Sequence, residues 1–189
     1  MALTYAPFGF RPVHDPSWRG RVTNVVDAVA SGYAANIYQG TPLKILTDGT
    51  LAVVSTTSDE IYGFFNGARW TDATGTPQID NRWISGTVAT NISFDVYLAP
   101  DVILEAQADG PVGVGARLDQ VNVVNPGAGV ALSGISTAGV SATPVGAGNQ
   151  GQFRVVGFSR IPGNTPGDAY TILKLQIARS AVLADAPAI

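Results

Sequence analysis

An Asp48-Gly49 pair between two apolar runs constrains the fold of this chain more than any other short stretch. Asp-Gly is favoured in a two-residue type I′ turn, because both central residues of that turn take a positive φ angle. Residues 42–47 and 50–54 are therefore predicted to pair as the two antiparallel strands of a hairpin.

The two-residue loop also predicts the register of this hairpin, with Leu46 opposite Leu51 and Ile45 opposite Ala52. In that register both faces are apolar apart from one lysine, so both faces need a cover. The cover would be a second sheet or another subunit. The face that another subunit would close holds Lys44, Leu46, Leu51 and Val53.

A second hairpin is predicted from residues 61–70, a loop over 71–77 and a return strand over 78–83. It carries most of the aromatic side chains of the chain. These side chains are either core residues, which we favour, or an exposed platform on which sugar rings would stack. They are Phe64, Phe65, Trp70 and Trp83.

The composition favours short strands joined by turns over helices. The 189 residues include 22 Gly and 12 Pro, and only 13% are charged. Lys and Glu, which are common on exposed helix faces, are scarce. Further strands are predicted over residues 21–30, 33–38, 88–98, 102–108, 117–124, 152–161 and 170–177. About eight to ten strands at this spacing are typical of an all-β fold, here a jelly-roll-like β-sandwich or barrel.

The chain is predicted to have an extended N-terminal arm (residues 1–22), a β-sandwich domain (23–178) and a C-terminal tail (179–189). Residues 110–150, within the domain, are rich in glycine and nearly uncharged. They are predicted to form a long surface excursion with one or two short strands. So few charges suit a subunit whose surface is partly covered by neighbours.

The N-terminal arm combines three prolines, which exclude a helix, with aromatic side chains that disordered tails rarely have. An arm of this kind is expected to lie on a surface, either that of its own domain or that of a partner subunit. If the surface belongs to a partner, the predicted binding residues are Phe8, Phe10, Arg11, Trp18, Arg19 and Arg21.

Catalytic and metal-binding chemistry has little support in the sequence. The chain has no Cys and one His, His14, which lies in the proline-rich arm, where a triad base would not be held rigidly. Four carboxylates that could serve a glycosidase are more simply turn and strand-end residues. They are Asp95, Asp101, Glu105 and Asp109. We therefore expect no enzyme activity, no metal and no cofactor.

Nucleic acid and membranes are not expected partners. The net charge of −3 gives no attraction to the phosphates of nucleic acid or to anionic lipid. No apolar run approaches the ~20 residues of a membrane-spanning helix, and the N-terminus has no secretory signal pattern.

Four stretches of the chain carry motifs that occur together in a known family. They are residues 6–12 (Ala-Pro-Phe-Gly-Phe-Arg-Pro), residues 32–42 (Gly-Tyr-Ala through Ile-Tyr-Gln-Gly-Thr-Pro), residues 63–77 and residues 154–177. Their order and spacing resemble the head decoration proteins of tailed bacteriophages, which are also described as capsid cement or capsid-stabilising proteins. Thr41 stands where that family usually has Asp.

The resemblance implies a β-rich, jelly-roll-like structural protein of the virion, without catalytic activity, that assembles as a homotrimer or another small oligomer. It implies that the protein is made in the host cytoplasm, binds the outer capsid surface and stabilises contacts between major capsid protein subunits. The alternative is a carbohydrate-binding β-sandwich, similar to an adhesin module, that would use exposed aromatic residues and glycine-rich loops.

Overall fold

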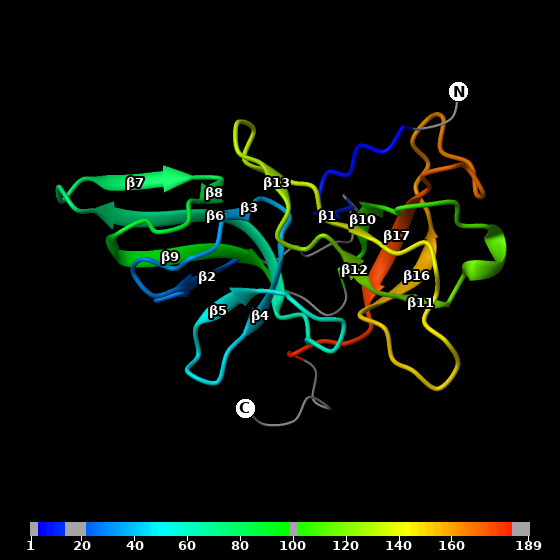
Figure 1. Ribbon diagram of the computed structural model, residues 1–189, viewed down its shortest axis with the longest axis horizontal. Coiled ribbons are helices and arrows are strands. Elements are labelled where there is room, and N and C mark those ends of the chain that lie inside the picture. The colour runs from blue at the N-terminus through cyan, green and yellow to red at the C-terminus, as the bar shows by residue number, and fades with distance from the viewer. Residues whose placement is uncertain (1–3, 14–21, 99–101, 183–189) are drawn as a thin grey trace.

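The computed structural model describes residues 4–13, 22–98 and 102–182, and these residues are almost entirely in strands, turns and loops. Two larger antiparallel sheets lie side by side along the long axis of the molecule, and three two-stranded ladders join or flank them (Figure 1). The described part of the chain has one short 3-10 helix, η1 (Val114–Ala116). The prediction of an all-β fold is confirmed, whereas the jelly-roll strand order stays a prediction.

The six-stranded sheet has the order β2-β9-β6-β4-β5, with β7 paired to the second half of β6. Its strands are β2 (Val22–Val26), β4 (Pro42–Ile45), β5 (Leu51–Val53), β6 (Gly63–Asp72), β7 (Pro77–Asp80) and β9 (Ala89–Tyr97). The long strands β6 and β9 form its centre. The predicted second hairpin is thus confirmed as β6 and β7, although Arg82 and Trp83 at the end of its predicted return strand pair with residues 37–38 instead.

The five-stranded sheet has the order β1-β10-β17-β16-β11. Its strands are β1 (Arg11–Pro12), β10 (Leu104–Gln107), β11 (Gln120–Val121), β16 (Phe153–Phe158) and β17 (Ile172–Ile177). The small ladders pair β3 (Ile37–Tyr38) with β8 (Arg82–Trp83), β12 (Val123–Val124) with β15 (Gly139–Val140), and β13 (Gly129–Val130) with β14 (Ile135–Ser136).

The β4–β5 hairpin forms, but its predicted register is wrong by one residue. Ile45 lies opposite Leu51, and the loop has three residues in place of two. The N–H of Gly49 donates to the carbonyl oxygen of Leu46, and the N–H of Leu46 donates to the carbonyl oxygen of Thr50. Of the loop residues, only Gly49 has a positive φ, at 84°. This is a turn followed by a glycine bulge, which avoids the cost of a positive φ at an aspartate.

The corrected register changes which side chains share a face of the hairpin, because a shift of one residue moves side chains to the other face. Leu43, Ile45, Leu51 and Val53 now lie together and pack on the protein's own core. On the opposite face, Lys44 forms an ion pair with Asp59 at 3.0 Å. The hairpin therefore gives no support for a subunit contact at this place.

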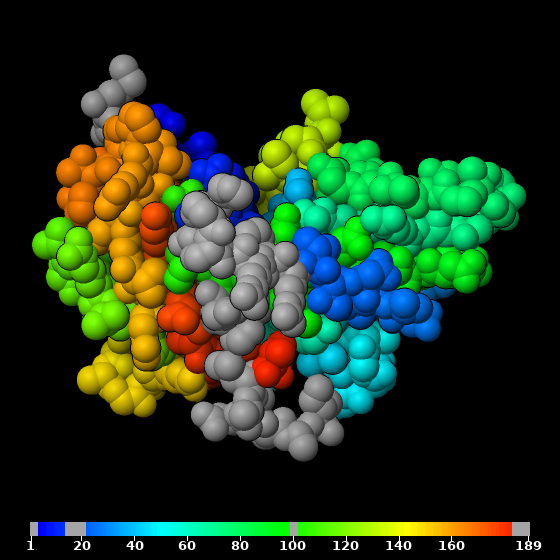
Figure 2. All heavy atoms as spheres, turned by 180° about the vertical axis from the view of Figure 1, so that it is seen from behind, coloured from blue at the N-terminus to red at the C-terminus, as the bar shows by residue number. Residues whose placement is uncertain are grey.

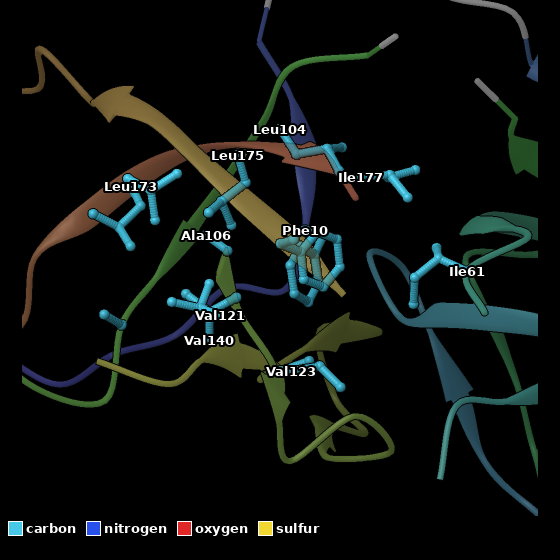
Figure 3. Close-up of a cluster of buried hydrophobic side chains, with 14 of the residues drawn as sticks. Phe10, Ile61, Leu104, Ala106, Val121, Val123, Val140, Leu173, Leu175 and Ile177 are labelled. Carbon is cyan, nitrogen blue, oxygen red and sulfur yellow. The ribbon is translucent and has the colours of Figure 1, made fainter. Parts of the chain in front are cut away.

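Two clusters of buried apolar side chains stabilise the molecule, and β6 contributes to both. Phe64 points into the first cluster, which lies under the five-stranded sheet, and its neighbour Phe65 points into the second, under the six-stranded sheet. Figure 3 shows the first cluster, with Phe10 at its centre and Ile61 reaching it from the side of the six-stranded sheet. The second cluster is built around Trp83 and Phe94.

The glycine-rich region 110–150 does not behave as a surface excursion. It contains five short strands, of which β12 pairs with β15, β13 pairs with β14 and β11 pairs with β16, and it contributes buried side chains to the first cluster. These buried side chains are Val112, Val121, Val123, Ala138 and Val140. Gly139 explains the need for glycine here, because a Cβ at this position would lie 2.5 Å from the carbonyl oxygen of Gln107. The predicted excursion is therefore wrong for these segments, which are part of the core.

The last strand matches its predicted pattern. Leu173, Leu175 and Ile177 of β17 are buried, and the residues between them are half-buried. After β17 the described part of the predicted tail contacts the segment just before β6, where the N–H of Ile61 donates to the carbonyl oxygen of Arg179. The domain boundaries at residues 22 and 178 stay predictions. The described residues before the first boundary and after the second nevertheless pack on the domain.

Candidate functional site

The described part of the predicted arm, residues 4–13, lies against the protein's own domain. Arg11 and Pro12 form β1 at the edge of the five-stranded sheet, where they pair with β10. The N–H of Phe10 donates to the carbonyl oxygen of Gly40 at 3.0 Å, on the side of the six-stranded sheet. This segment therefore bridges the two halves of the molecule.

Phe10, one of the predicted partner-binding residues, is a core residue. Its side chain is 1% exposed and stacks on the ring of Phe153, with the ring centroids 4.7 Å apart. A second aromatic contact joins it to Phe64 at 5.2 Å. Of the two surfaces considered for the arm, Phe10 therefore occupies that of its own domain and is not accessible to a partner.

Phe8 and Arg11 differ from Phe10 because both reach the surface. The guanidinium carbon of Arg11 lies 4.2 Å from the centroid of the Phe8 ring, a cation–π contact. The same guanidinium forms an ion pair with Glu105 at 3.2 Å. Glu105 also accepts a hydrogen bond from the hydroxyl of Ser159 at 2.7 Å. The charge of Arg11 is thus balanced within the molecule, while half of its side chain stays exposed.

The remaining predicted partner-binding residues are Trp18, Arg19 and Arg21, and they lie outside the described residues, as does His14. The structure therefore places three of the six residues. It brings Phe8 and Arg11 together at one surface and puts Phe10 directly beneath them.

A hollow of about 250 Å³ opens beside this segment and is walled mostly by apolar atoms. Its lining comes from the N-terminal segment, the turn before β4, the end of β9 and the start of β14. The lining residues are Phe8, Phe10, Arg11, Pro12, Gln39, Gly40, Tyr97 and Ile135. We call this site the N-terminal hollow. In Figure 2 the dark blue N-terminal segment and the yellow-green β13–β14 hairpin stand on either side of a recess at the top of the molecule.

The β13–β14 hairpin, which forms one wall of the N-terminal hollow, is held firmly to its neighbours. The N–H of Gln39 donates to the carbonyl oxygen of Gly134, and Gln39 accepts from the N–H of Ser136, each at 2.9 Å. The side-chain amide of Asn81 donates to the carbonyl oxygen of Ser133 at 3.0 Å. At the tip of this hairpin Leu132 is 96% exposed.

Three of the four carboxylates considered for a glycosidase have a structural partner. Asp95 accepts hydrogen bonds from Asn24 and Arg69, and Asp109 accepts one from the N–H of Ala142. Glu105 is paired with Arg11, as described above, and Asp101 lies outside the described residues. These contacts agree with the interpretation of Asp95, Glu105 and Asp109 as structural residues.

Two other carboxylates have lowered pKa values because they organise turns. Burial raises the pKa of Asp59, but N–H groups of Ser55 and Thr56 and the Lys44 ammonium outweigh burial and lower it on balance. The hydroxyl of Thr74, with further donors in the β6–β7 loop, lowers the pKa of Asp72 to about 2. A general acid at neutral pH needs a raised pKa, so neither group suits that role.

The aromatic residues of β6 and β8 form no exposed platform. Phe64, Phe65 and Trp83 are buried, and Trp70 packs edge-on against Trp83 with the ring centroids 5.5 Å apart. The core interpretation of these residues is therefore confirmed. A second, polar hollow of about 380 Å³ lies near Arg179, and no aromatic side chain lines it.

Among the residues that the structure describes, no group of three or more His, Asp or Glu side chains converges as a metal site would require. No helix in the same residues is long and apolar enough to cross a membrane. Comparison of the chain with protein-family models, with curated proteins and with solved structures found no match.

The sequence-based prediction missed most of the wall of the N-terminal hollow. Gln39, Tyr97 and Ile135 come from three separate segments, and only the tertiary structure brings them together. The exposed Leu132 was also missed, although Gly129 and Gly134 around it gave a hairpin signal inside the glycine-rich region.

Proposed function

We propose that this chain is a structural protein of a bacteriophage head, which binds the outer capsid surface and stabilises contacts between major capsid protein subunits. The ordered set of motifs that resembles head decoration proteins carries the proposal. The surface at Phe8 and Arg11 supports it, because a half-buried aromatic ring stacked with an exposed arginine is a common composition of protein–protein contacts.

The fold suits a protein that must resist being pulled apart. Residues 4–13 bridge the two sheets, and the described end of the chain ties β17 back to Ile61. Each half of the molecule is therefore connected to the other by chain segments from both ends. A clamp between capsid subunits must resist separation, and connections of this kind oppose the opening of its own halves.

Attachment to the capsid is tested with purified particles that lack the protein. We expect the wild-type protein to bind at a fixed number of copies per particle, seen by sedimentation and by cryo-electron microscopy. The double variant Phe8→Ala, Arg11→Ala should bind at least about tenfold more weakly, since paired aromatic and arginine contacts are typical binding hot spots. Arg160→Ala, an exposed arginine on the loop after β16, is the matched control.

The side-chain variants are a sharper test than deletion of residues 2–20. That deletion also removes Phe10 and strand β1, so a loss of binding would not be separable from a loss of stability. If particles never carry the wild-type protein, the proposed function is contradicted. If particles bind the double variant and wild type equally, the proposed docking surface is contradicted. The carbohydrate alternative has lost its aromatic platform, since three of its four residues are buried.

A further inference from the structure

The polar hollow near Arg179, of about 380 Å³, shares no lining residue with the N-terminal hollow. Its walls come from the loop before β6, the residue between β11 and β12, the loop before β16 and the chain after β17. Its volume lies at the lower end of the range for small-molecule sites. Among the described residues that line it, Arg179 alone is charged.

The guanidinium of Arg179 is held in place without an acidic partner among the described residues. Its Nη1 donates to the carbonyl oxygen of Ser58 at 2.8 Å, and its Nη2 donates to the carbonyl oxygen of Gln150 at 3.2 Å. Asp59, the residue after Ser58, is paired with Lys44 instead. Arg179 is half-buried, and a guanidinium has five N–H donors, so charge and donors remain for a ligand.

Uncharged side chains of the polar hollow add further N–H and O–H donors. The side-chain oxygen of Asn122 accepts from the N–H of Gln152 at 3.2 Å, and no described residue accepts from its amide nitrogen. The side-chain amide of Asn149 and the hydroxyl of Thr57 are also without a partner in the described part of the chain. A positive charge surrounded by donors repels a metal cation and suits an oxyanion.

The walls of the polar hollow are fixed by contacts that do not involve a ligand. The N–H groups of Ser55 and Thr56 donate to the carboxylate of Asp59 at 2.7 and 2.9 Å. The buried side chain of Gln152 donates to the carbonyl oxygens of Thr56 and Asp59, each at 3.1 Å, and accepts from the N–H of Val123. One side chain thus ties the loop before β6 to β12, and a pre-organised site loses little entropy on binding.

We propose that the polar hollow binds a small oxyanion, a phosphate or a carboxylate group. Arg179 is its charged anchor, and Asn122 and Asn149 are further donors. Arg11 shows the contrast, because Glu105 already neutralises that arginine at 3.2 Å. The proposed site lies apart from the surface at Phe8 and Arg11 and is independent of binding to a capsid.

Inorganic phosphate and acetate are the probes, each added to the isolated protein at constant ionic strength and followed by NMR chemical shifts. We expect a dissociation constant in the millimolar range for phosphate, as for one small anion on an open site. Arg179→Gln should raise this constant at least about tenfold, because charge-assisted hydrogen bonds are lost. Arg179→Lys should give an intermediate value, since an ammonium keeps the charge but has no planar pair of N–H donors.

Asn122→Asp tests the site without removal of an observed contact, because the new carboxylate can still accept from the N–H of Gln152. Its negative charge should raise the dissociation constant at least about tenfold by repulsion of the anion. Asn36→Asp is the matched control. Asn36 is exposed, lies outside the hollow and also accepts a backbone N–H, that of Ser85 at 2.8 Å. The control should bind phosphate as wild type does.

The proposal is overturned if neither probe binds wild type at about 50 mM, more than ten times a millimolar dissociation constant. It is also overturned if Asn122→Asp binds phosphate as well as wild type does. Binding of phosphate alone would assign the site to tetrahedral anions, and binding of acetate would show that one carboxylate is sufficient. Urea unfolding of each variant separates a loss of binding from a loss of stability. No capsid is present, so failure here and failure of capsid attachment are distinguishable.

Discussion

Replacement of Phe10 by alanine should cost the protein a large part of its stability. The ring is 1% exposed, stacks on Phe153 at 4.7 Å and contacts Phe64 at 5.2 Å. Truncation of a buried Phe to Ala typically costs about 3–5 kcal/mol, because contacts are lost and a cavity remains. We expect a value in the upper half of that range, since the ring also anchors residues 4–13 between the two sheets.

Urea unfolding followed by tryptophan fluorescence measures this cost. With an m-value of about 2 kcal/mol/M, a loss of about 4 kcal/mol lowers the midpoint by about 2 M. Phe8→Ala is the matched control, because it removes a phenyl ring from a half-buried position only two residues before Phe10. We expect that control to cost about 1 kcal/mol. If Phe10→Ala and Phe8→Ala cost the same, the placement of Phe10 in the core is wrong.

Three further predictions concern turns and close contacts. Because the pKa of Asp59 is lowered in the folded protein, the ionised carboxylate contributes its full stabilisation above about pH 4, and this contribution is lost as the pH falls below that value. The thermal midpoint should therefore fall less between pH 6 and pH 2.5 in Asp59→Asn than in wild type. Gly63→Ala should destabilise by about 1–3 kcal/mol in urea unfolding, because its Cβ would lie 2.7 Å from a backbone oxygen of Tyr97; no loss would show that β6 and β9 can separate there. Gly49→Ala should lower the free energy of unfolding by about 1 kcal/mol through the positive φ alone, since no atom crowds the position. Gly49→Asn should lower it by less, and equal losses for the two variants would argue against the observed turn.

The strands with a clear two-residue alternation could be predicted from the sequence. Leu173, Leu175 and Ile177 alternate with polar residues, and this pattern depends only on the geometry of a half-buried strand. The β6–β7 hairpin was equally accessible, because a glycine- and proline-containing loop separates a run rich in aromatic residues from a short return strand. Local chemistry was sufficient in both cases.

The features that were missed depend on contacts between distant segments. Local rules allow Asp48-Gly49 either a two-residue or a three-residue loop, and the packing of Leu43 and Leu51 on the core favours the latter. The glycine-rich region looked like a surface loop because its buried residues are small. Val140 and its neighbours fill space next to closely approaching backbone, and composition does not reveal that space.

The position of Phe10 also has a consequence for how the protein is made. At about 5–20 residues per second, a ribosome needs roughly 7–30 s to add the chain between Phe10 and Phe153. Throughout that time the ring lacks the partner on which it finally stacks. The first segment to be synthesised is thus among the last to dock, and the emerging chain exposes an aromatic segment that a chaperone or a neighbouring nascent chain can bind. Slow synthesis or crowded polysomes should therefore reduce the soluble yield of this protein more than that of one whose N-terminus pairs locally.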